Sequence, residues 1–374
     1  MFIEVHMLKN YAPSNLNRDD TGSPKSCLFG GVPRGRISSQ CQKRTVRTSD
    51  ILRDAVGIEN LGLRTRKLPK LIVDELAARG IGEEYLAIVR KKITGFGNKE
   101  GKESKDDLTA QIMFFSPADI AAAAECVHKS IKEAGSIAAF EKVKAKDLQS
   151  DMRALRPITL DIALFGRMIT SDAFRDVEAA MQVAHAFSTN RLEQEFDYYT
   201  AMDDLLAQGE ETGAGMIGDV EFNSNCYYHY FNLDVDQLLS NLDGVEAKGE
   251  LVIKAIPALI RAFAYSSPSG KQNSFAAHQL PSVVCVEIKK EKIPVSYANA
   301  FVKPAYAGRE SNLIDDSILK LVKEIDRIDD KFDIPLQKRL WFCTEEVAAP
   351  SASQTLGRVA EVFDSVSNML REAI

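Results

Sequence analysis

Residues 34–56 read RGRISSQCQKRTVRTSDILRDAV, and the fold assignment starts from the helix that this stretch contains. Ser39 and Gln42 have the spacing of a capping box, which predicts a helix that begins there and runs to about Val56. One face of this helix carries polar and basic side chains, namely Gln40, Lys43, Arg44 and Arg47. A separate, more apolar face, which we expect to pack on a sheet, carries Cys41, Thr45, Thr48 and Leu52.

On either side of this helix, strand and helix patterns alternate. Apolar and polar residues alternate over 2–8, which predicts a strand, and a long loop rich in Gly, Pro, Asn and Asp is expected over 9–37. Further strands are expected at 177–189, where a helix is the competing interpretation, and at 219–231 and 282–288, with a helix at 245–265. The order strand, helix, strand, strand, helix, strand is that of the ferredoxin-like fold, which RNA-recognition domains share. We therefore predict an α+β, ferredoxin-like (RRM-like) domain, although this fold alone assigns no function.

Two insertions interrupt this order. The first, residues 57–176, is predicted to be mostly helical, with a strong helix start at Ser116-Pro117. The second, residues 190–218, is polar and acidic, with a short helix expected near 198–207. The C-terminal part is predicted to be helical apart from a short segment at 340–343.

The bulk composition excludes several classes of protein. The chain has 374 residues, of which 45% are hydrophobic and 27% are charged, as in ordinary globular proteins. No apolar run approaches the roughly 18 residues that a membrane span needs, and the first residues lack the pattern of a secretory signal. The motifs GxxxxGK[ST], GxGxxG and GxSxG are absent, which removes the usual support for nucleotide-hydrolysing, dinucleotide-binding and serine-hydrolase functions.

The six cysteines and five histidines lack the spacing of metal ligands. No cysteine pair has C-x-x-C spacing, and no histidine pair has H-E-x-x-H spacing. We therefore expect free thiols in a reducing cytoplasm and no metal site.

Charge is distributed unevenly along the chain. The net charge of −6, from 47 basic and 53 acidic residues, taken alone argues against a nucleic-acid-binding protein. Six basic residues and no acidic one occur between Lys25 and Arg47, and they are Lys25, Arg34, Arg36, Lys43, Arg44 and Arg47. The rest of the chain then has 41 basic against 53 acidic residues, a balance of −12. From Arg191 to Glu221 the reverse holds, with nine acidic residues against one basic residue.

This basic stretch predicts a binding site for a string of phosphates. Lys and Arg side chains would line a groove, and backbone amides near Ser38 and Ser39 would add hydrogen-bond donors. The alternative is a solvated face with local ion pairs. The lack of acidic residues within the stretch favours the polyanion site.

Other candidate residues each have two interpretations. Met168 follows a Gly-Arg pair and is either an exposed wedge against a base or core filler. Tyr198 and Tyr199 either stack on bases or are buried anchors of an insertion. The polar loop around Lys271 and Gln272 either contacts a nucleic-acid backbone or turns the chain.

Two neighbouring carboxylates suggest a catalytic alternative. Asp19 and Asp20 are candidate metal ligands for phosphodiester cleavage. With Arg18 adjacent, a salt-bridged brace of the loop is the other interpretation.

Several short motifs together resemble one family. They are Asn17–Asp20, Phe29–Gly31, Arg36–Gln40, Lys43-Arg44, Asp161–Met168, Ala184–Ala186, Asp197–Leu205 and Gly270–Ala277. Each motif is weak alone, but in this order they span nearly the whole chain. The sequence resembles the CasC family, the backbone subunit of the type I-E CRISPR Cascade complex.

The resemblance implies a hand-shaped protein that assembles on RNA. A ferredoxin-like palm with a helical C-terminal extension would comprise 1–56, 177–189 and 219–374, helical fingers 57–176, and a thumb 190–218. Family members stack head to tail along a guide RNA as an open filament. The thumb of one copy kinks the RNA of its neighbour, and the bases between kinks face outward to pair with target DNA. The implied partners are guide RNA, a target DNA strand, further copies and other Cascade subunits, with no cofactor, metal or membrane.

The resemblance also implies which residues contact the RNA. In the palm they are Arg18, Lys25, Ser38, Gln40, Lys43, Arg44 and Arg47. The wedge and the thumb contacts would be Arg167, Met168, Tyr198, Tyr199 and Thr200, and the last matched motif adds Lys271 and Gln272. This chain has a Tyr-Tyr pair where Trp-Phe also occurs in the family, and Arg47 where Lys can occur.

The leading prediction is therefore a non-catalytic guide-RNA scaffold. The main alternative is a metal-dependent ribonuclease, because related backbone subunits of type III complexes cut RNA with an aspartate in the loop after the first strand, where Asp19 and Asp20 lie. A helical scaffold that binds only protein is the third possibility.

Overall fold

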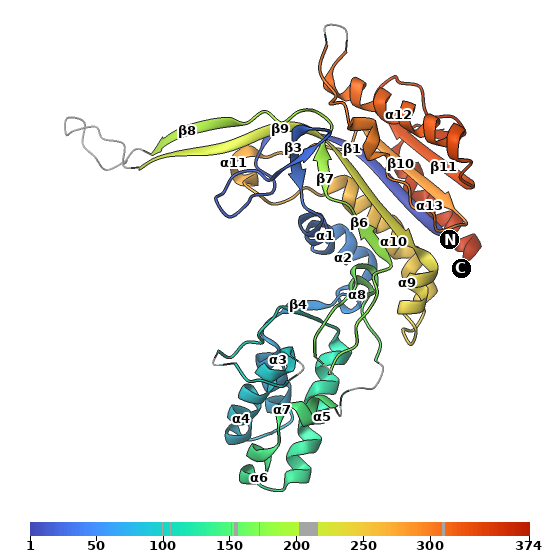
Figure 1. Ribbon diagram of the computed structural model, residues 1–374. Coiled ribbons are helices and arrows are strands. Elements are labelled where there is room, and N and C mark those ends of the chain that lie inside the picture. The colour runs from blue at the N-terminus through green and yellow to red at the C-terminus, as the bar shows by residue number, and fades with distance from the viewer. Residues whose placement is uncertain are drawn as a thin grey trace, which may run out of the picture. The chain divides into compact units, whose positions relative to one another are not determined.

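The computed structural model describes residues 1–98, 100–104, 106–150, 152, 156–171, 173–201, 216–308 and 311–374 (Figure 1). The chain divides into two compact units. Unit 1 comprises residues 1–52, 183–232 and 253–374, and unit 2 comprises residues 53–182 and 233–252.

A large sheet lies mainly in unit 1, with the start of β6 and the end of β9 in unit 2. Its strands are β1 (Phe2–Ser14), β2 (Ser26–Phe29), β3 (Val32–Ile37), β6 (Met181–Val183), β7 (Ala186–Ser188), β8 (Glu195–Ala201), β9 (Met216–Asp234), β10 (Val283–Lys289), β11 (Leu336–Cys343) and β12 (Ser353–Leu356). Within the described residues the order is β12-β11-β10-β1-β9-β7-β3-β2, and β6 and β8 also pair with β9. β1 and β10 are antiparallel, from the pair Phe2 and Lys289 to the pair Leu8 and Val283. The α+β class predicted from the sequence is confirmed.

Helices cover both faces of this sheet. Those with most of their residues in unit 1 are α1 (Ser39–Arg47), α10 (Lys248–Tyr265), α11 (Gln272–Phe275), the 3-10 helix η3 (Tyr297–Phe301), α12 (Leu313–Phe332) and α13 (Val359–Ala373). On one face, Tyr228 and Trp341 of the sheet share a buried core with Ile318 of α12. On the other face, the ring of Phe231 stacks on Phe263 of α10 with 4.2 Å between centroids. Successive residues of a strand point to opposite faces, so β9 contributes to both cores.

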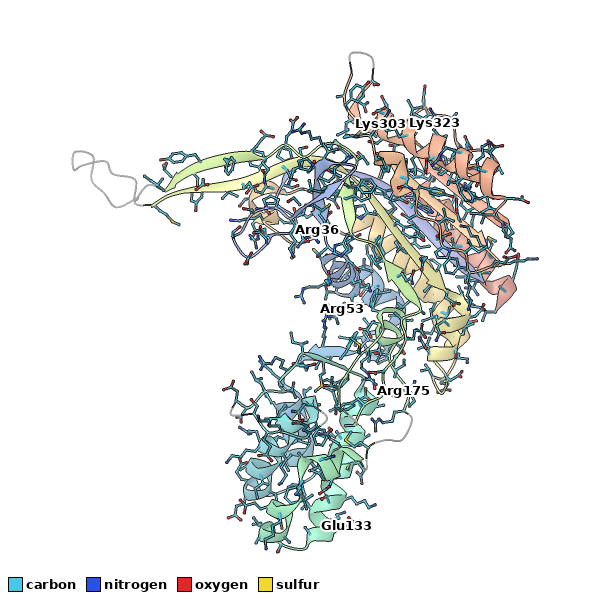
Figure 2. The ribbon with its side chains drawn as sticks, viewed as in Figure 1. Arg36, Arg53, Glu133, Arg175, Lys303 and Lys323 are labelled. Carbon is cyan, nitrogen blue, oxygen red and sulfur yellow. The ribbon has the colours of Figure 1, made fainter. Side chains whose placement is uncertain are left out.

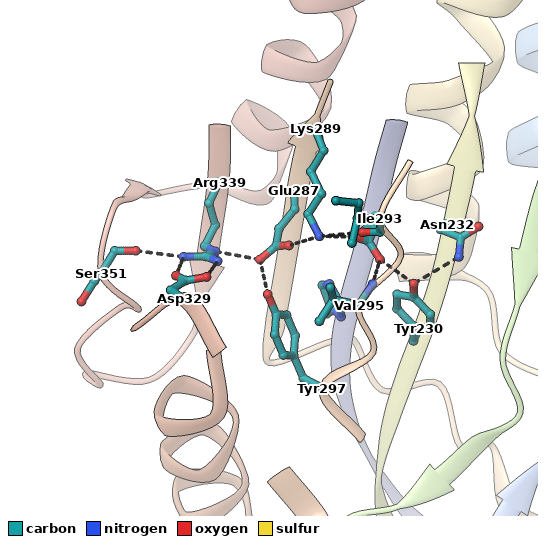
Figure 3. A network of polar contacts seen from close by, with 12 residues as sticks. Tyr230, Asn232, Glu287, Lys289, Ile293, Val295, Tyr297, Asp329, Arg339 and Ser351 are labelled. Atoms are coloured by element: carbon teal, nitrogen blue, oxygen red, sulfur yellow. Dashed lines mark hydrogen bonds and ion pairs between the residues drawn. The ribbon is translucent and has the colours of Figure 1, made fainter. Parts of the chain in front are cut away.

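A chain of charged groups, all buried except the partly exposed Asp329, crosses the α12 face of the sheet (Figure 3). Arg339 on β11 donates hydrogen bonds to Glu287 on β10 at 2.8 Å and to Asp329 of α12 at 2.7 Å. Lys289 lies 3.4 Å from Glu287 and also pairs with Glu4 on β1. Removal of one member of such a buried set leaves its partner charge uncompensated. The network therefore favours the register in which β1, β10, β11 and α12 bring these groups together.

The loop predicted over 9–37 is wrong for much of its length. β1 continues to Ser14, and β2 and β3 form an antiparallel hairpin. Gly30 and Gly31 form its turn with φ of 61° and 75°, the left-handed region that glycine tolerates best. The Gly, Pro, Asn and Asp residues of this region indicate turns, and the short strands beside them have no alternation of their own in the sequence.

The single helix predicted over 39–56 is also wrong. It is divided into α1 and α2 (Asp50–Val56), and the hydroxyl of Ser49 accepts a hydrogen bond from the amide of Leu52 at 3.3 Å. The short helix expected near 198–207 is a strand up to Ala201, and the remainder of that prediction lies outside the described residues. The C-terminal part contains β12 as well as the expected segment, which extends over the whole of β11.

Unit 2 is mostly helical, as predicted for the first insertion. Its helices include α3 (Leu68–Ala78), α4 (Glu83–Thr94), α5 (Pro117–Ala134), α6 (Ile137–Lys142), α7 (Ala145–Ser150), α8 (Leu160–Phe165) and α9 (Val235–Asn241), with the 3-10 helices η1 (Ile58–Asn60) and η2 (Gly95–Gly97). The strands β4 (Leu63–Thr65) and β5 (Met113–Phe115) form a small antiparallel sheet. A core of aliphatic and aromatic side chains joins α3, α4 and α5.

The limits of unit 2 differ from those predicted for the fingers. Unit 2 begins at Arg53 and its first segment ends at Gln182, whereas the sequence indicated 57–176. It also includes residues 233–252, which the sequence analysis placed in the palm.

Candidate nucleic-acid interface

The first turn of α1 is fixed to the loop that follows β1. Ser38 is the N-cap, and its hydroxyl accepts a hydrogen bond from the amide of Cys41 at 3.3 Å. The amide of Ser38 donates to the side chain of Asn17 at 2.8 Å. The predicted capping box of Ser39 and Gln42 is therefore wrong by one position. Ser38 is buried and serves as the cap.

The face of α1 that packs on the sheet is formed by Gln42 and Val46, both buried. The side-chain amide of Gln42 donates to the carbonyl of Ala184 at 2.9 Å, and its oxygen lies 2.8 Å from Nδ1 of His229. A polar residue thus occupies the packed face because its hydrogen bonds are satisfied there. The expectation that Thr45 and Thr48 pack on the sheet is wrong.

The remaining surface of α1 carries the predicted polar and basic residues. Gln40 and Arg44 are exposed, and Lys43 and Arg47 are partly buried. Burial lowers the pKa of Lys43. One helix therefore positions four of the predicted RNA-contacting residues, as its spacing indicated.

A groove with a volume of about 710 Å³ runs beside this surface. The loop 16–19 and the segment 265–270 line it, together with α1, the start of α2 and His278. Arg18 and Arg44 both contribute to its walls, so the structure brings together two basic residues from separate parts of the chain.

The two loops that line the groove pack closely at Gly270. A Cβ at Gly270 would lie 2.4 Å from the carbonyl oxygen of Leu16 and 2.6 Å from that of Asn15. Only glycine allows this approach of backbone to backbone. Gly270 therefore sets the shape of the groove, a role that the sequence analysis did not assign to it.

Asp19 braces the loop in which it lies. Its Oδ1 accepts hydrogen bonds from the amide and hydroxyl of Thr21 at 3.0 and 2.7 Å and from the amide of Ser23 at 3.0 Å. The hydroxyl of Thr21 is the main cause of the lowered pKa of Asp19. The loop is thus braced by Thr21 and Ser23, whereas the bracing interpretation of the sequence assigned this role to a salt bridge with Arg18. Asp20 beside it is exposed.

Arg34 belongs to the basic stretch of the sequence but is buried in unit 1. Its guanidinium donates hydrogen bonds to the carbonyls of Thr189 at 2.5 Å and Phe301 at 2.6 Å, and also to those of Ser188 and Asn190. Arg34 therefore holds distant segments together. One of the six basic residues of this stretch is therefore not available to a ligand.

Arg36 of β3, which is labelled in Figure 2, forms a hydrogen bond with a histidine. It donates to Nδ1 of His185 at 3.0 Å and to the carbonyl of Ser26 at 3.1 Å. Burial, followed by the charges of Arg36 and Lys25, lowers the pKa of His185. The same Lys25 charge also acts on the thiol of Cys41 in α1. Nothing in the sequence around His185 indicates its contact with Arg36, which lies 149 positions earlier in the chain.

The β8–β9 hairpin carries the predicted thumb residues. Tyr198 pairs with Asp219, Tyr199 with Gly218 and Thr200 with Ile217 across the two strands. All three predicted residues are exposed, and 66% of the surface of Tyr198 is accessible. The interpretation of both tyrosines as buried anchors is therefore wrong. Residues 202–215 of the predicted thumb lie outside the described residues.

In unit 2, Arg167 and Met168 have opposite environments. Met168 is 91% exposed, so its interpretation as core filler is wrong. Arg167 is buried and donates hydrogen bonds to Asp119 at 2.6 Å and to the carbonyl of Phe114 at 3.1 Å. Contact between Arg167 and RNA stays a prediction, and it would require this buried pair to open.

Lys271 and Gln272 form the turn at the start of α11. Lys271 has φ of 49°, and the side-chain amide of Gln272 donates to the carbonyls of Pro268 at 2.9 Å and Ala277 at 3.1 Å. Gln272 therefore braces the loop that borders the groove, and its contact with RNA stays a prediction. Phe275 of α11 packs against Phe222 of β9 with 5.6 Å between centroids.

Two further features concern metals and membranes. The described residues include no group of three or more His, Cys, Asp or Glu side chains placed to hold a metal ion. Among the helices of the described residues, none has both the length and the apolar character that a membrane span requires. None of the six cysteines, all of which are described, forms a disulfide bond.

Comparison with known proteins gives a family match over almost the whole chain. The model of the CT1975-like proteins matches residues 3–368. A solved chain of a "CRISPR RNA-guided surveillance complex, pre-nicking" is 25% identical, with a TM-score of 0.82 over 100% of both chains. A chain of another "CRISPR RNA-guided surveillance complex" shares the fold, with 22% identity and a TM-score of 0.62 over 100% of both chains. No curated protein matches. The chain belongs to the family of CT1975-like proteins.

Proposed function

We propose that this protein is a non-catalytic backbone subunit of a CRISPR surveillance complex and that it binds guide RNA along α1. The family match and the full-length similarity to chains of CRISPR RNA-guided surveillance complexes support a role in CRISPR interference. The narrower assignment to CasC of a type I-E complex rests on the ordered sequence motifs.

The basic surface of α1 beside the groove is the observation that carries this proposal. Arg44 is exposed there, and Lys43 and Arg47 lie on the same helix. Arg18 reaches the groove from the loop after β1. Several cations along one path suit consecutive phosphates, and the forked guanidinium of arginine suits phosphate oxygens.

The sheet supports the proposed palm. The four strands of the predicted series correspond, in chain order, to β1, β7, β9 and β10. In the sheet they lie in the order β10-β1-β9-β7. This is the arrangement expected of a ferredoxin-like domain. Unit 2 then corresponds to the fingers and the β8–β9 hairpin to the thumb. Copies would stack head to tail on the guide RNA and leave its bases free to pair with target DNA.

The proposed absence of catalysis rests on the environment of Asp19. Its Oδ1 accepts hydrogen bonds from Thr21 and Ser23, which favours a bracing role over metal binding. Assembled complex mixed with complementary RNA and magnesium should leave that RNA intact. Cleavage at regular spacing that stops in an Asp19→Ala variant would instead establish the ribonuclease.

Reversal of charge on α1 tests the RNA-binding proposal. We expect Lys43→Glu combined with Arg47→Glu to abolish co-purification of RNA and RNA-dependent assembly, because two cations become anions beside the phosphates. The matched control is Lys303→Glu combined with Lys323→Glu, which changes net charge equally at two exposed positions (Figure 2). Circular dichroism and thermal unfolding verify that both variants fold.

The result separates the proposed scaffold from its alternatives. Loss of RNA in the α1 variant with retention in the control supports the proposal. Unchanged RNA co-purification in the folded α1 variant contradicts it. Assembly that is insensitive to both salt and ribonuclease would indicate a scaffold that binds only protein.

A further inference from the structure

Two threonine hydroxyls close to Arg44 in the chain have already donated their hydrogens. Oγ1 of Thr45 donates to the carbonyl of Cys41 at 3.0 Å, and Oγ1 of Thr48 donates to the carbonyl of Arg44 at 2.9 Å. Both threonines line the groove. A hydroxyl has one hydrogen and two lone pairs, so each oxygen now offers the groove only acceptor capacity.

Acceptor oxygens in this position do not match phosphate. A phosphodiester has no hydrogen to donate, and its oxygens repel other oxygens with unshared pairs. The cations among the residues that line the groove are Arg18 and Arg44, whose guanidinium groups have hydrogens and no acceptor. Donors and acceptors alternate along one helix, because Arg44 lies beside Thr45 and one turn before Thr48.

A polynucleotide that matches both the guanidinium donors and the threonine acceptors must carry a hydrogen-bond donor close to each phosphate. The ribose 2′-hydroxyl is such a donor, and it is the group that distinguishes RNA from DNA. Deoxyribose has only carbon-bound hydrogen there. The pattern of α1 therefore corresponds to the sugar-phosphate backbone of RNA and not to that of DNA.

We infer that Thr45 and Thr48 accept hydrogen bonds from ribose 2′-hydroxyls while Arg44 binds an adjacent phosphate, so that this wall of the groove selects RNA over DNA. The inference rests on the proposed RNA-binding function and identifies two specificity-determining residues. The two threonines select the sugar, and the arginines bind any phosphate chain.

Binding of three oligonucleotides of one unstructured sequence tests this inference. Fluorescence anisotropy would compare single-stranded RNA, the corresponding DNA, and 2′-O-methyl RNA, which keeps the oxygen but lacks the hydrogen. The unmodified protein should bind RNA more tightly than either of the other two. Thr45→Val combined with Thr48→Val keeps the shape of both side chains and removes both acceptors. It should weaken RNA binding roughly tenfold and leave DNA binding unchanged.

Two further variants distinguish hydroxyl recognition from a general change in the groove. Thr45→Ser combined with Thr48→Ser keeps both hydroxyls and should keep the preference for RNA. Arg44→Ala should weaken RNA and DNA binding by the same factor, because phosphate is common to both.

The outcomes separate this inference from the function on which it rests. If the double valine variant keeps the RNA-to-DNA affinity ratio of the unmodified protein, the assignment of Thr45 and Thr48 is overturned while RNA binding stands. If the unmodified protein binds 2′-O-methyl RNA as tightly as RNA, the donor role of the 2′-hydroxyl is overturned. If it binds none of the three, the proposed function itself is overturned.

Discussion

The guanidinium of Arg167 donates a hydrogen bond to the carboxylate of Asp119 at 2.6 Å, and both side chains are buried within unit 2. The other oxygen of this carboxylate lies 3.3 Å from Nε of Arg156. Asp119 also accepts a hydrogen bond from the amide of Ser116 in the capping box of α5. The pair therefore joins the start of α5 to the segment that carries the exposed Met168.

The first prediction concerns the stability that this pair provides. We expect Arg167→Met to lower the free energy of unfolding by about 3–5 kcal/mol, because Asp119 loses its closest cation while it remains buried. Urea denaturation measures the change. The matched control is Arg79→Met, which breaks partly exposed ion pairs with Glu75 and Glu125 and should cost less than about 1 kcal/mol. Equal losses in the two variants would contradict the structural role of Arg167.

The second prediction concerns Met168, whose side chain is 91% exposed. We expect Met168→Ala to change the free energy of unfolding by no more than about 0.5 kcal/mol, because little packing is lost. In the assembled complex the same variant should alter base stacking in the guide RNA, if Met168 is the proposed wedge. The fluorescence of 2-aminopurine, placed at successive positions of the guide, reports that stacking. Identical fluorescence profiles with and without Met168 would rule out the wedge.

The third prediction concerns Arg34, whose guanidinium binds backbone carbonyls of residues 188–190, which precede β8. Replacement by methionine would leave the carbonyls of Thr189 and Phe301 buried without their charged donor. We expect a loss of about 3 kcal/mol in the free energy of unfolding, since an unsatisfied buried polar group costs about 1–3 kcal/mol. Amide exchange should accelerate in the segments around these two residues. Arg36→Met is the control, because Arg36 is only half-buried and should show a smaller loss.

Arg34 also shows what the sequence can predict about the site and where such prediction ends. Its charge is visible in the sequence, but the carbonyls that bind it come from residues about 150 and 270 positions further along the chain. No local pattern indicates those partners. The spacing on α1 correctly grouped Lys43, Arg44 and Arg47, since helical periodicity is a local property.

The two threonines of the groove illustrate a second limit. An amphipathic pattern assigns polar residues to solvent and apolar residues to the packed face. In α1 the packed face contains Gln42, because His229 and Ala184 satisfy its amide. This rotates the buried face away from Thr45 and Thr48. The long strands β1, β9 and β10 were predictable from the alternation of apolar and polar residues, whereas the short strands β2 and β3 were hidden between turn residues.

The last prediction concerns acid stability and the buried His229. Burial lowers its pKa to about 3, and burial likewise lowers the pKa of His6 to about 4. Because the amide nitrogen of Gln42 donates to Ala184, the Gln42 oxygen must accept a hydrogen from Nδ1 of His229. The neutral ring with its hydrogen on Nδ1 is therefore the folded form.

The sign of the pH dependence follows from proton binding in the two states. An unfolded histidine takes up a proton below pH about 6.5, whereas His229 stays neutral in the folded chain, so the unfolded state binds more protons and stability falls as the pH decreases. Between pH about 6.5 and 4 the loss from His229 is on the order of 3 kcal/mol. His229→Asn keeps a donor for Gln42 and cannot titrate, so urea denaturation across this range should give a flatter dependence than the unmodified protein. An unchanged slope in this variant would show that acid lability originates at other groups.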